Sequence, residues 1–159
     1  MRYNPSKTIT GRALWGVFTA ILLFMPLGVV LAEAPLNKDA DNVAIEGYDT
    51  VAYFTEGQAV KGKPELEVVW HGARWFFSSA NHRNLFAAAP ERYAPQFGGL
   101  CAGAMRRGVV VKADPEAWTI VDGKLYMKVS KEARDEWREH PAENIREANE
   151  AWAEMVEKD

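Results

Sequence analysis

The sequence predicts one small α+β domain, with two short β-hairpins and about four helices, preceded by an N-terminal signal or anchor segment. Two pairs of β-rich runs are each separated by a two-residue turn, and serine, proline and glycine residues delimit the helical stretches. The beginning of the chain is basic and then apolar. The 159 residues are 48% hydrophobic, which suits a single domain plus a targeting segment.

Residues 1–12 are polar and basic, and residues 13–31 are uncharged and mostly apolar, as in a signal peptide. A cut before Glu33 is favoured over a cut after Ala34, because Pro35 would follow the second one. An uncleaved membrane anchor is the alternative, since an apolar stretch of this length can span a bilayer. We therefore expect a periplasmic or secreted domain after cleavage, or a domain anchored in the inner membrane and facing the periplasm.

The charge of the chain excludes some partners. The formal net charge of the chain is −3. The leader holds three basic residues, Arg2, Lys7 and Arg12, so the chain without its leader is more negatively charged. Such a domain has no electrostatic reason to bind nucleic acid or anionic lipid. Membrane contact is expected only through residues 1–32, if they are retained.

The first half of the domain predicts a hairpin followed by short helices. We expect a polar linker at residues 33–42 and the domain at residues 43–159, beginning with an extended segment and then a strand or helical turn at 51–54. Runs 66–70 and 73–77 predict a hairpin around His71-Gly72. Ser78 or Ser79 then caps a helix to about Ala89, Pro90 starts a short turn, and a further short helix carries the only cysteine.

The second half repeats the hairpin-then-helix order. Residues 109–111 fit either a strand or the end of the preceding helix. Runs 118–121 and 124–129 flank Asp122-Gly123, the strongest hairpin signal in the chain. Ser130 is expected to cap a helix to about Glu139, and a last helix is expected over residues 142–157, where apolar residues recur at spacings of three and four.

Two blocks of the sequence resemble the YHS domain family in its exported form. The matching residues are Gly47-Tyr48-Asp49, Val51-Ala52-Tyr53-Phe54, Trp75, Phe77-Ser78-Ser79-Ala80, Arg83, Phe86, Pro90, Tyr93-Ala94-Pro95-Gln96-Phe97-Gly98-Gly99 and Cys101-Ala102. The resemblance implies a compact α+β domain related to small metal-binding, treble-clef-like modules, including the TRASH-like ones. The cysteine-rich branches of these families carry several cysteines, whereas this chain has one. A four-ligand site is therefore not inherited by resemblance.

Cys101 is the first candidate for chemistry. Gly98-Gly99 predicts a helix start near Leu100, and a thiol in a first helical turn is favoured as the thiolate, which suits soft-metal binding or redox chemistry. A small buried core residue is the alternative. With no second cysteine in the chain, no intramolecular disulfide can form.

Other donors could join the thiolate at a metal site. Met105 lies four residues after Cys101, so a helix would place both sulfurs on one face, and copper(I) prefers soft ligands; core filling is the ordinary explanation of such a methionine. His71, in the hairpin turn, and His82, on an exposed helix face, are the nearest candidate nitrogen ligands. Neither occupies a position of the family motif that we identify.

The other motif residues that we single out are Tyr48, Asp49, Tyr53, Tyr93, Gly98 and Gly99. Asp49 in particular is expected to cap or brace the region of Cys101. No pattern of a catalytic triad, a phosphate-binding loop or paired carboxylates stands out.

The first hypothesis is a non-enzymatic, exported YHS-type protein that binds a soft metal ion, copper, through Cys101 with help from Met105 or a histidine. One alternative is a structural or protein-interaction module with a buried cysteine, and another is a thiol redox protein. The expected partners are a metal ion or a periplasmic or membrane protein.

Overall fold

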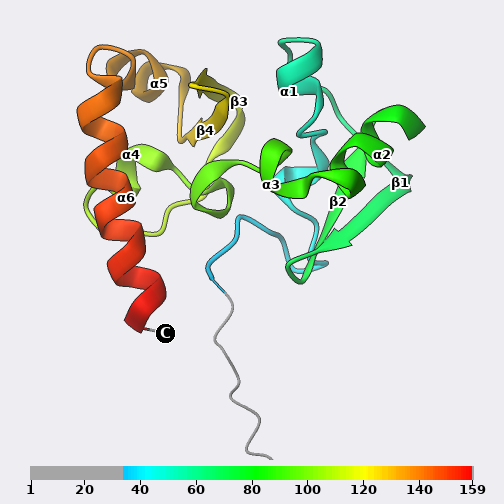
Figure 1. Cartoon of the computed structure of the whole chain (residues 1–159), viewed down its shortest axis with the longest axis horizontal. Coiled ribbons are helices and arrows are strands. Elements are labelled where there is room, and N and C mark those ends of the chain that lie inside the picture. Colours follow the sequence, from blue (N-terminus) through cyan, green and yellow to red (C-terminus); the bar gives the residue numbers. More distant parts are fainter. Residues whose placement is uncertain (1–33, 159) are drawn as a thin grey trace, which may run out of the picture. The chain divides into compact units, whose positions relative to one another are not determined.

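The structure is a computed structural model and describes residues 34–158 (Figure 1). The expected signal or anchor segment, residues 1–32, lies outside the described residues. Within residues 34–158, none of the helices combines the length and the apolar character that crossing a bilayer requires.

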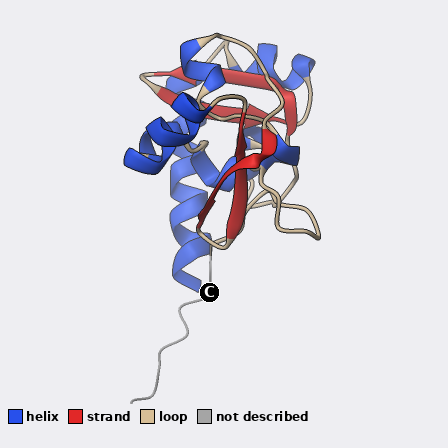
Figure 2. Cartoon of the chain, turned by 90° about the vertical axis from the view of Figure 1, so that its right-hand side faces the viewer, coloured by secondary structure: helices blue, strands red, loops and turns tan. Residues whose placement is uncertain are grey.

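The α+β class is confirmed. The described part of the chain holds two separate antiparallel hairpins and six α-helices, three of which are single turns of four residues. Figure 2 shows the strands as two distinct pairs with helices around them. Two short 3-10 segments, η1 (Ile45–Gly47) and η2 (Gln96–Gly99), connect these elements.

The first hairpin consists of β1 (Lys63–Trp70) and β2 (Ala73–Phe77). His71 and Gly72 both have positive φ, 46° and 63°, which confirms the two-residue turn. β2 is almost wholly buried while β1 keeps a solvent-facing side. β2 therefore packs against the core, and β1 lies between β2 and the solvent.

The second hairpin consists of β3 (Asp114–Val121) and β4 (Lys124–Lys128) and turns at Asp122-Gly123, as predicted. β3 begins four residues earlier than the apolar run suggests, because an irregularity between Asp114 and Trp118 lets the strand pair again beyond it. Residues 109–111, expected to be strand or helix, form a loop in which Val110 is 52% exposed.

Most helices begin where the capping residues predict. The helices are α1 (Ala52–Thr55), α2 (Ala80–Ala88), α3 (Pro90–Tyr93), α4 (Ala102–Met105), α5 (Lys131–Trp137) and α6 (Pro141–Lys158). Ser79 accepts a hydrogen bond from the His82 backbone N–H, and Ser130 caps α5 in the same way. α6 begins at Pro141, one residue before the expected start, and the missing N–H of a proline costs nothing at that position.

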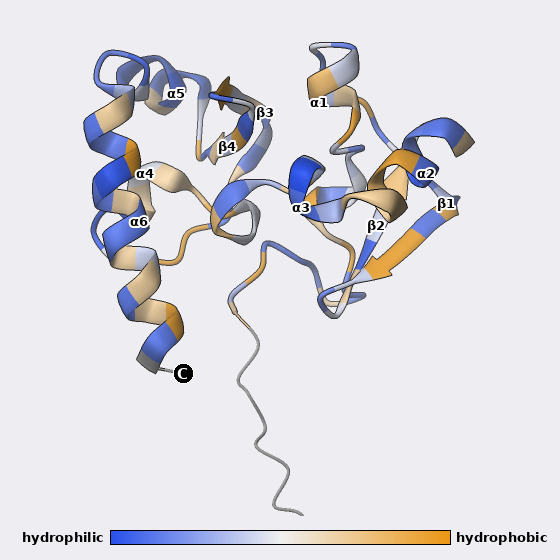
Figure 3. Ribbon diagram, in the orientation of Figure 1, coloured by the Kyte–Doolittle hydropathy of each residue, from blue (hydrophilic) through white to orange (hydrophobic). Residues whose placement is uncertain are grey.

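The core has two clusters. The first gathers β2, α2 and the start of the domain around Trp75, Phe77 and Phe86, and the second packs α4 and α6 around Phe97 and Trp137. Figure 3 shows hydrophobic and hydrophilic residues alternating along α6, as expected for a helix that buries one face.

The segment expected to be a linker packs against the domain instead. Asn37 is buried, its backbone N–H donates to the Gly98 carbonyl at 2.8 Å, and its side-chain amide donates to the Gly99 carbonyl at 3.1 Å. The Ile45 N–H donates back to the Asn37 carbonyl. The polar composition predicted a linker, because the sequence does not distinguish a buried asparagine that bonds backbone groups from an asparagine in an exposed loop.

Candidate functional site

Asp49 joins the two blocks of the family motif. Its carboxylate is fully buried and accepts hydrogen bonds from the backbone N–H groups of Val51 and Ala52 at the start of α1. The other oxygen accepts from the backbone N–H of Ser78 at 2.8 Å and its hydroxyl at 2.6 Å. A buried carboxylate needs such partners to offset its lost hydration. Asp49 therefore holds α1 against the residues that lead into α2.

His82 completes this group and is not exposed as expected. Its side chain is 10% exposed, and Nδ1 lies 2.7 Å from the Asp49 carboxylate. Nε2 faces outward, 3.3 Å from the Thr55 hydroxyl and 3.7 Å from the Glu56 carboxylate. The helical period put His82 on the outer side of α2, but α1 covers that side. The His82 imidazole is therefore part of the buried hydrogen-bond network around Asp49.

The tyrosines of the motif also have structural partners. The Tyr53 hydroxyl donates to the Pro115 carbonyl at 2.9 Å, and burial raises the pKa of this phenol far above its ordinary value. This bond joins the first half of the domain to β3. Tyr48 stacks under the Lys61 ammonium, 4.1 Å from the ring centre, and Tyr93 meets Phe54 edge to face.

Gly98 and Gly99 are required by the close approach of the N-terminal segment. Both have positive φ, 59° and 73°. A Cβ at Gly98 would lie 2.2 Å from the Pro35 carbonyl oxygen, and one at Gly99 would lie 2.2 Å from the Ile45 side chain. The two glycines therefore let residues 35–45 pack on η2.

Cys101 differs from these motif residues because its side chain forms no hydrogen bond within the described part of the chain. It precedes α4 as the N-cap residue rather than lying inside the helix, and it pairs in a single parallel bridge with Met127 of β4. The residue is only 2% exposed. The expected first-turn position is thus displaced by one residue, because the chain is still extended at Cys101.

The Cys101 side chain borders a cavity of about 460 Å³ between α4, α5 and the start of α6. A Cβ at Gly103 would lie 3.8 Å from the sulfur, so the missing side chain leaves the thiol less covered on that side. His140, Asn144, Trp137 and Glu136 belong to the same lining, together with Arg106 and Arg107. The cavity therefore combines a thiol, an imidazole and a mostly basic rim.

His140 is not among the candidate ligands that the sequence patterns indicate. No local pattern links it to Cys101, 39 positions earlier, and only the packing of α4 against α6 brings both to one cavity. His71 and Met105 do not line this cavity. Met105 packs in the second core cluster and Cys101 in the first, so their side chains do not form the expected common face.

Lys128 of β4 is a second unusual group near the thiol. It is fully buried, its ammonium lies 3.8 Å from the centre of the Trp137 ring, and its only hydrogen-bond acceptor in the described residues is the Met127 carbonyl at 3.5 Å. Burial lowers the pKa of Lys128 from 10.5 to about 7, and the negative charge of ionised Cys101 opposes this effect. The two groups are thus close enough to interact electrostatically.

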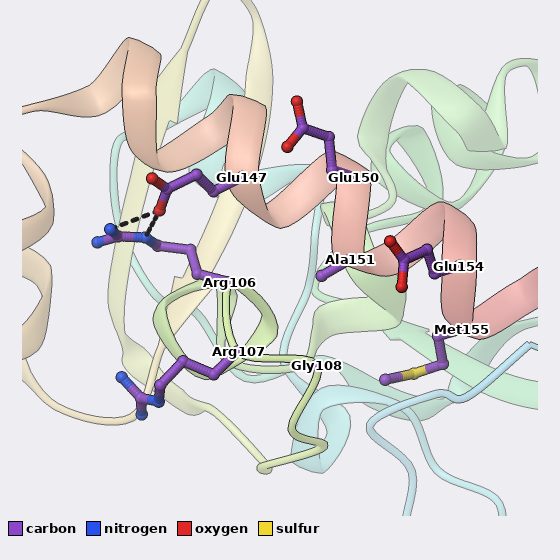
Figure 4. Close-up of a pocket in the computed structure, with 8 residues that line it drawn as sticks. All are labelled: Arg106, Arg107, Gly108, Glu147, Glu150, Ala151, Glu154 and Met155. Atoms are coloured by element: carbon purple, nitrogen blue, oxygen red, sulfur yellow. Dashed lines mark hydrogen bonds and ion pairs between the residues drawn. The ribbon is translucent and has the colours of Figure 1, made fainter.

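Arg106 separates this cavity from a second, larger hollow along α6. Figure 4 shows Arg106 reaching Glu147 while Arg107 extends away from it, with Glu150 and Glu154 further along the helix. The Arg106 guanidinium bonds the Glu147 carboxylate at 2.6 and 2.7 Å. This ion pair fixes the end of α4 to α6.

Comparison with known families identifies the class of domain. The YHS domain model matches residues 51–97, which span α1, the first hairpin, α2, α3 and part of η2. Residues 51–97 thus have the sequence pattern of a YHS domain. Asp49 and Cys101 lie just outside the matched residues. No curated protein and no solved structure matches the chain.

The YHS domain suggests a possible metal-binding module. Within residues 34–158, no three histidine, cysteine or acidic side chains gather closely enough to hold a metal ion. Cys101, His140 and Glu136 line one cavity without converging as a three-ligand cluster, and the thiol and the imidazole are the two donors that suit a soft ion. That set fits an ion of low coordination number and excludes a structural zinc site built from the described residues alone.

Proposed function

We propose that this protein is a non-enzymatic YHS domain protein that binds a soft metal ion, copper(I), through the Cys101 thiolate. His140 replaces Met105, His71 and His82 as the second donor. The protein would hold or pass on the ion in a compartment outside the cytoplasm.

The observation that carries the proposal is the contrast between Cys101 and the other polar motif residues. Asp49, Ser78 and Tyr53 are each occupied by buried hydrogen bonds that hold the fold together. Among residues 34–158 the Cys101 thiol has no such partner, and Cys101 lines a cavity together with His140. A buried motif side chain that packs in the core but forms no hydrogen bond in the described residues is the best candidate for function.

The donor set favours copper(I) over harder ions. Thiolate sulfur is a soft ligand and imidazole nitrogen also suits copper. The basic rim would oppose a divalent cation more strongly than a monovalent one. Because the pKa of Lys128 is lowered to about 7, part of its positive charge is absent at neutral pH.

Thiol redox chemistry is the second candidate, and the basic surroundings of Cys101 favour it. A nearby cation stabilises a thiolate, the form that attacks peroxides. In that reaction the thiolate takes one oxygen from hydrogen peroxide to give sulfenic acid, and the other oxygen leaves as water. The cavity of about 460 Å³ would admit a small thiol to reverse the oxidation.

Anaerobic competition for copper(I) against a chromophoric chelator tests the first proposal. The wild-type protein is compared with Cys101→Ser, His140→Ala and Gly103→Ala, and His71→Ala serves as the control because His71 lies in an exposed turn away from the cavity. We expect one copper(I) per chain, lost in Cys101→Ser and weakened in His140→Ala. Gly103→Ala should also weaken binding, because its methyl group would cover the sulfur at an ordinary contact distance.

The alternatives predict other results. Equal, weak binding by wild type and Cys101→Ser would refute the metal proposal. A thiol that reacts with peroxide but gains no stability from copper(I) would support the redox candidate. A thiol that resists alkylating reagents until the protein unfolds would leave a structural or protein-interaction module with a buried cysteine.

The proposed location rests on residues 1–32 alone. We expect export, with either cleavage before Glu33 or retention as an inner-membrane anchor. Mass spectrometry of the N-terminus of the protein isolated from cells distinguishes the two, and recovery from the cytoplasm with residues 1–32 intact would contradict both.

A further inference from the structure

A small apolar cavity lies away from Cys101, on the side of the domain where the described chain begins. It measures about 160 Å³ and is lined by Trp70 and Trp75 of the first hairpin, Trp152 of α6, the segment 34–36 and the loop 94–98, with His71 at its edge. None of its lining residues belongs to the Cys101 cavity.

The fold holds this cavity in place from four parts of the chain. Trp75 is 1% exposed, and its indole N–H donates to the Trp70 carbonyl at 3.0 Å, which fixes one wall. Trp70 meets Trp75 edge to face at 5.8 Å between ring centres. The wall at Pro35 is set by its close approach to Gly98, where no side chain fits. Such a cavity exists before any ligand arrives.

The lining decides the class of ligand. Among residues 34–158, no carboxylate and no lysine or arginine lines the cavity, so neither a cation nor an anion would find a partner of opposite charge there. Trp70 and Trp152 offer ring faces and edges, and their indole N–H groups have no hydrogen-bond acceptor in the described part of the chain. Aromatic rings pack well against indoles in edge-to-face and offset arrangements.

The volume decides the size of the ligand. An engineered apolar cavity of about 150 Å³ in another protein binds benzene, and the present cavity, which is partly open to solvent, has a similar volume. Drug-sized ligands need pockets of roughly 300 to 1,000 Å³, well above the volume here. We infer that this tryptophan-lined cavity is a binding site for a single uncharged aromatic ring, independent of the chemistry at Cys101.

The inference can be tested by fluorine NMR with 4-fluorophenol as the probe and tetramethylammonium as a competitor of the wrong charge. In Ala94→Leu the larger side chain would fill the cavity, and in Trp152→Ala one wall would be removed. Trp118→Phe is the matched control, because Trp118 packs on Tyr53 outside the cavity. Circular dichroism and thermal unfolding identify any variant that fails to fold, and either of the two cavity variants suffices.

We expect saturable binding of 4-fluorophenol to the wild-type protein and to Trp118→Phe, unaffected by tetramethylammonium. Binding should be lost in Ala94→Leu and weakened in Trp152→Ala, while copper(I) binding stays as in the wild type. The same response in all four proteins would place the probe elsewhere, for example on the apolar residues 13–31, and would overturn the inference. Displacement by tetramethylammonium would also overturn it, since a cation site needs a different lining.

Discussion

Replacing Lys128 with methionine should stabilise the protein and remove part of its dependence on pH. Lys128 is fully buried, and in the described residues its ammonium contacts one distant carbonyl and the rings of Trp137 and Tyr126, with no carboxylate partner. Methionine has a similar length and no charge to desolvate. The pKa of Lys128 is lowered from 10.5 to about 7, chiefly by burial.

The sign and size of the effect follow from these two values. At pH values between about 7 and 10.5, Lys128 is protonated in the unfolded chain and mostly neutral in the folded chain. The free energy of unfolding therefore rises with pH in this range. The destabilising effect of Lys128 on the folded state should therefore fall by about 2 to 3 kcal/mol between about pH 6 and about pH 9. Below the folded pKa the penalty is constant, because both states are then protonated.

Urea unfolding of wild type, Lys128→Met and Lys124→Met at several pH values measures this contribution. Lys124 is an exposed lysine of the same strand and serves as the control. The difference between Lys128→Met and wild type should be largest at low pH and shrink towards pH 9, whereas Lys124→Met should follow the wild type. A pH-independent difference would refute the reasoning, because it would mean that Lys128 keeps an ordinary pKa in the folded protein.

Three further substitutions test how the motif residues hold the fold. Asp49→Asn should cost about 3 kcal/mol in urea unfolding, because it breaks a buried, charge-assisted network; an unchanged midpoint would show that the carboxylate is dispensable. Tyr53→Phe should cost about 1 to 2 kcal/mol by leaving the buried Pro115 carbonyl without a donor, and a stability equal to wild type would argue against this bond. Gly98→Ala should lower the thermal midpoint clearly, since the new methyl group would collide with the Pro35 carbonyl; a wild-type midpoint would mean that residues 34–36 do not pack on η2.

The local signals predicted the elements well. His71-Gly72 and Asp122-Gly123 take the positive φ values that two-residue hairpin turns require, and Ser79 and Ser130 cap the helices that follow them. Each of these decisions depends on two to four neighbouring residues. Sequence is informative at that range because backbone conformation and capping are local properties.

The site was less predictable because it is assembled over long distances. The helical period predicted an exposed His82. No residue near it in the sequence indicates that Asp49 and Thr55, from the segment around α1, contact its imidazole. His140 meets the cavity of Cys101 only because α6 packs on α4. Buried polar partners of this kind are set by tertiary contacts, which a periodic pattern does not encode.

The central claim is that Cys101 and a histidine of the same cavity hold a soft metal ion. X-ray absorption at the copper edge of copper(I)-loaded protein tests it most directly, with His140→Ala for comparison. The account predicts a site with one sulfur and one nitrogen ligand in the wild type and the loss of the nitrogen ligand in His140→Ala. A spectrum that keeps its nitrogen ligand in His140→Ala, or that lacks sulfur in the wild type, would contradict it.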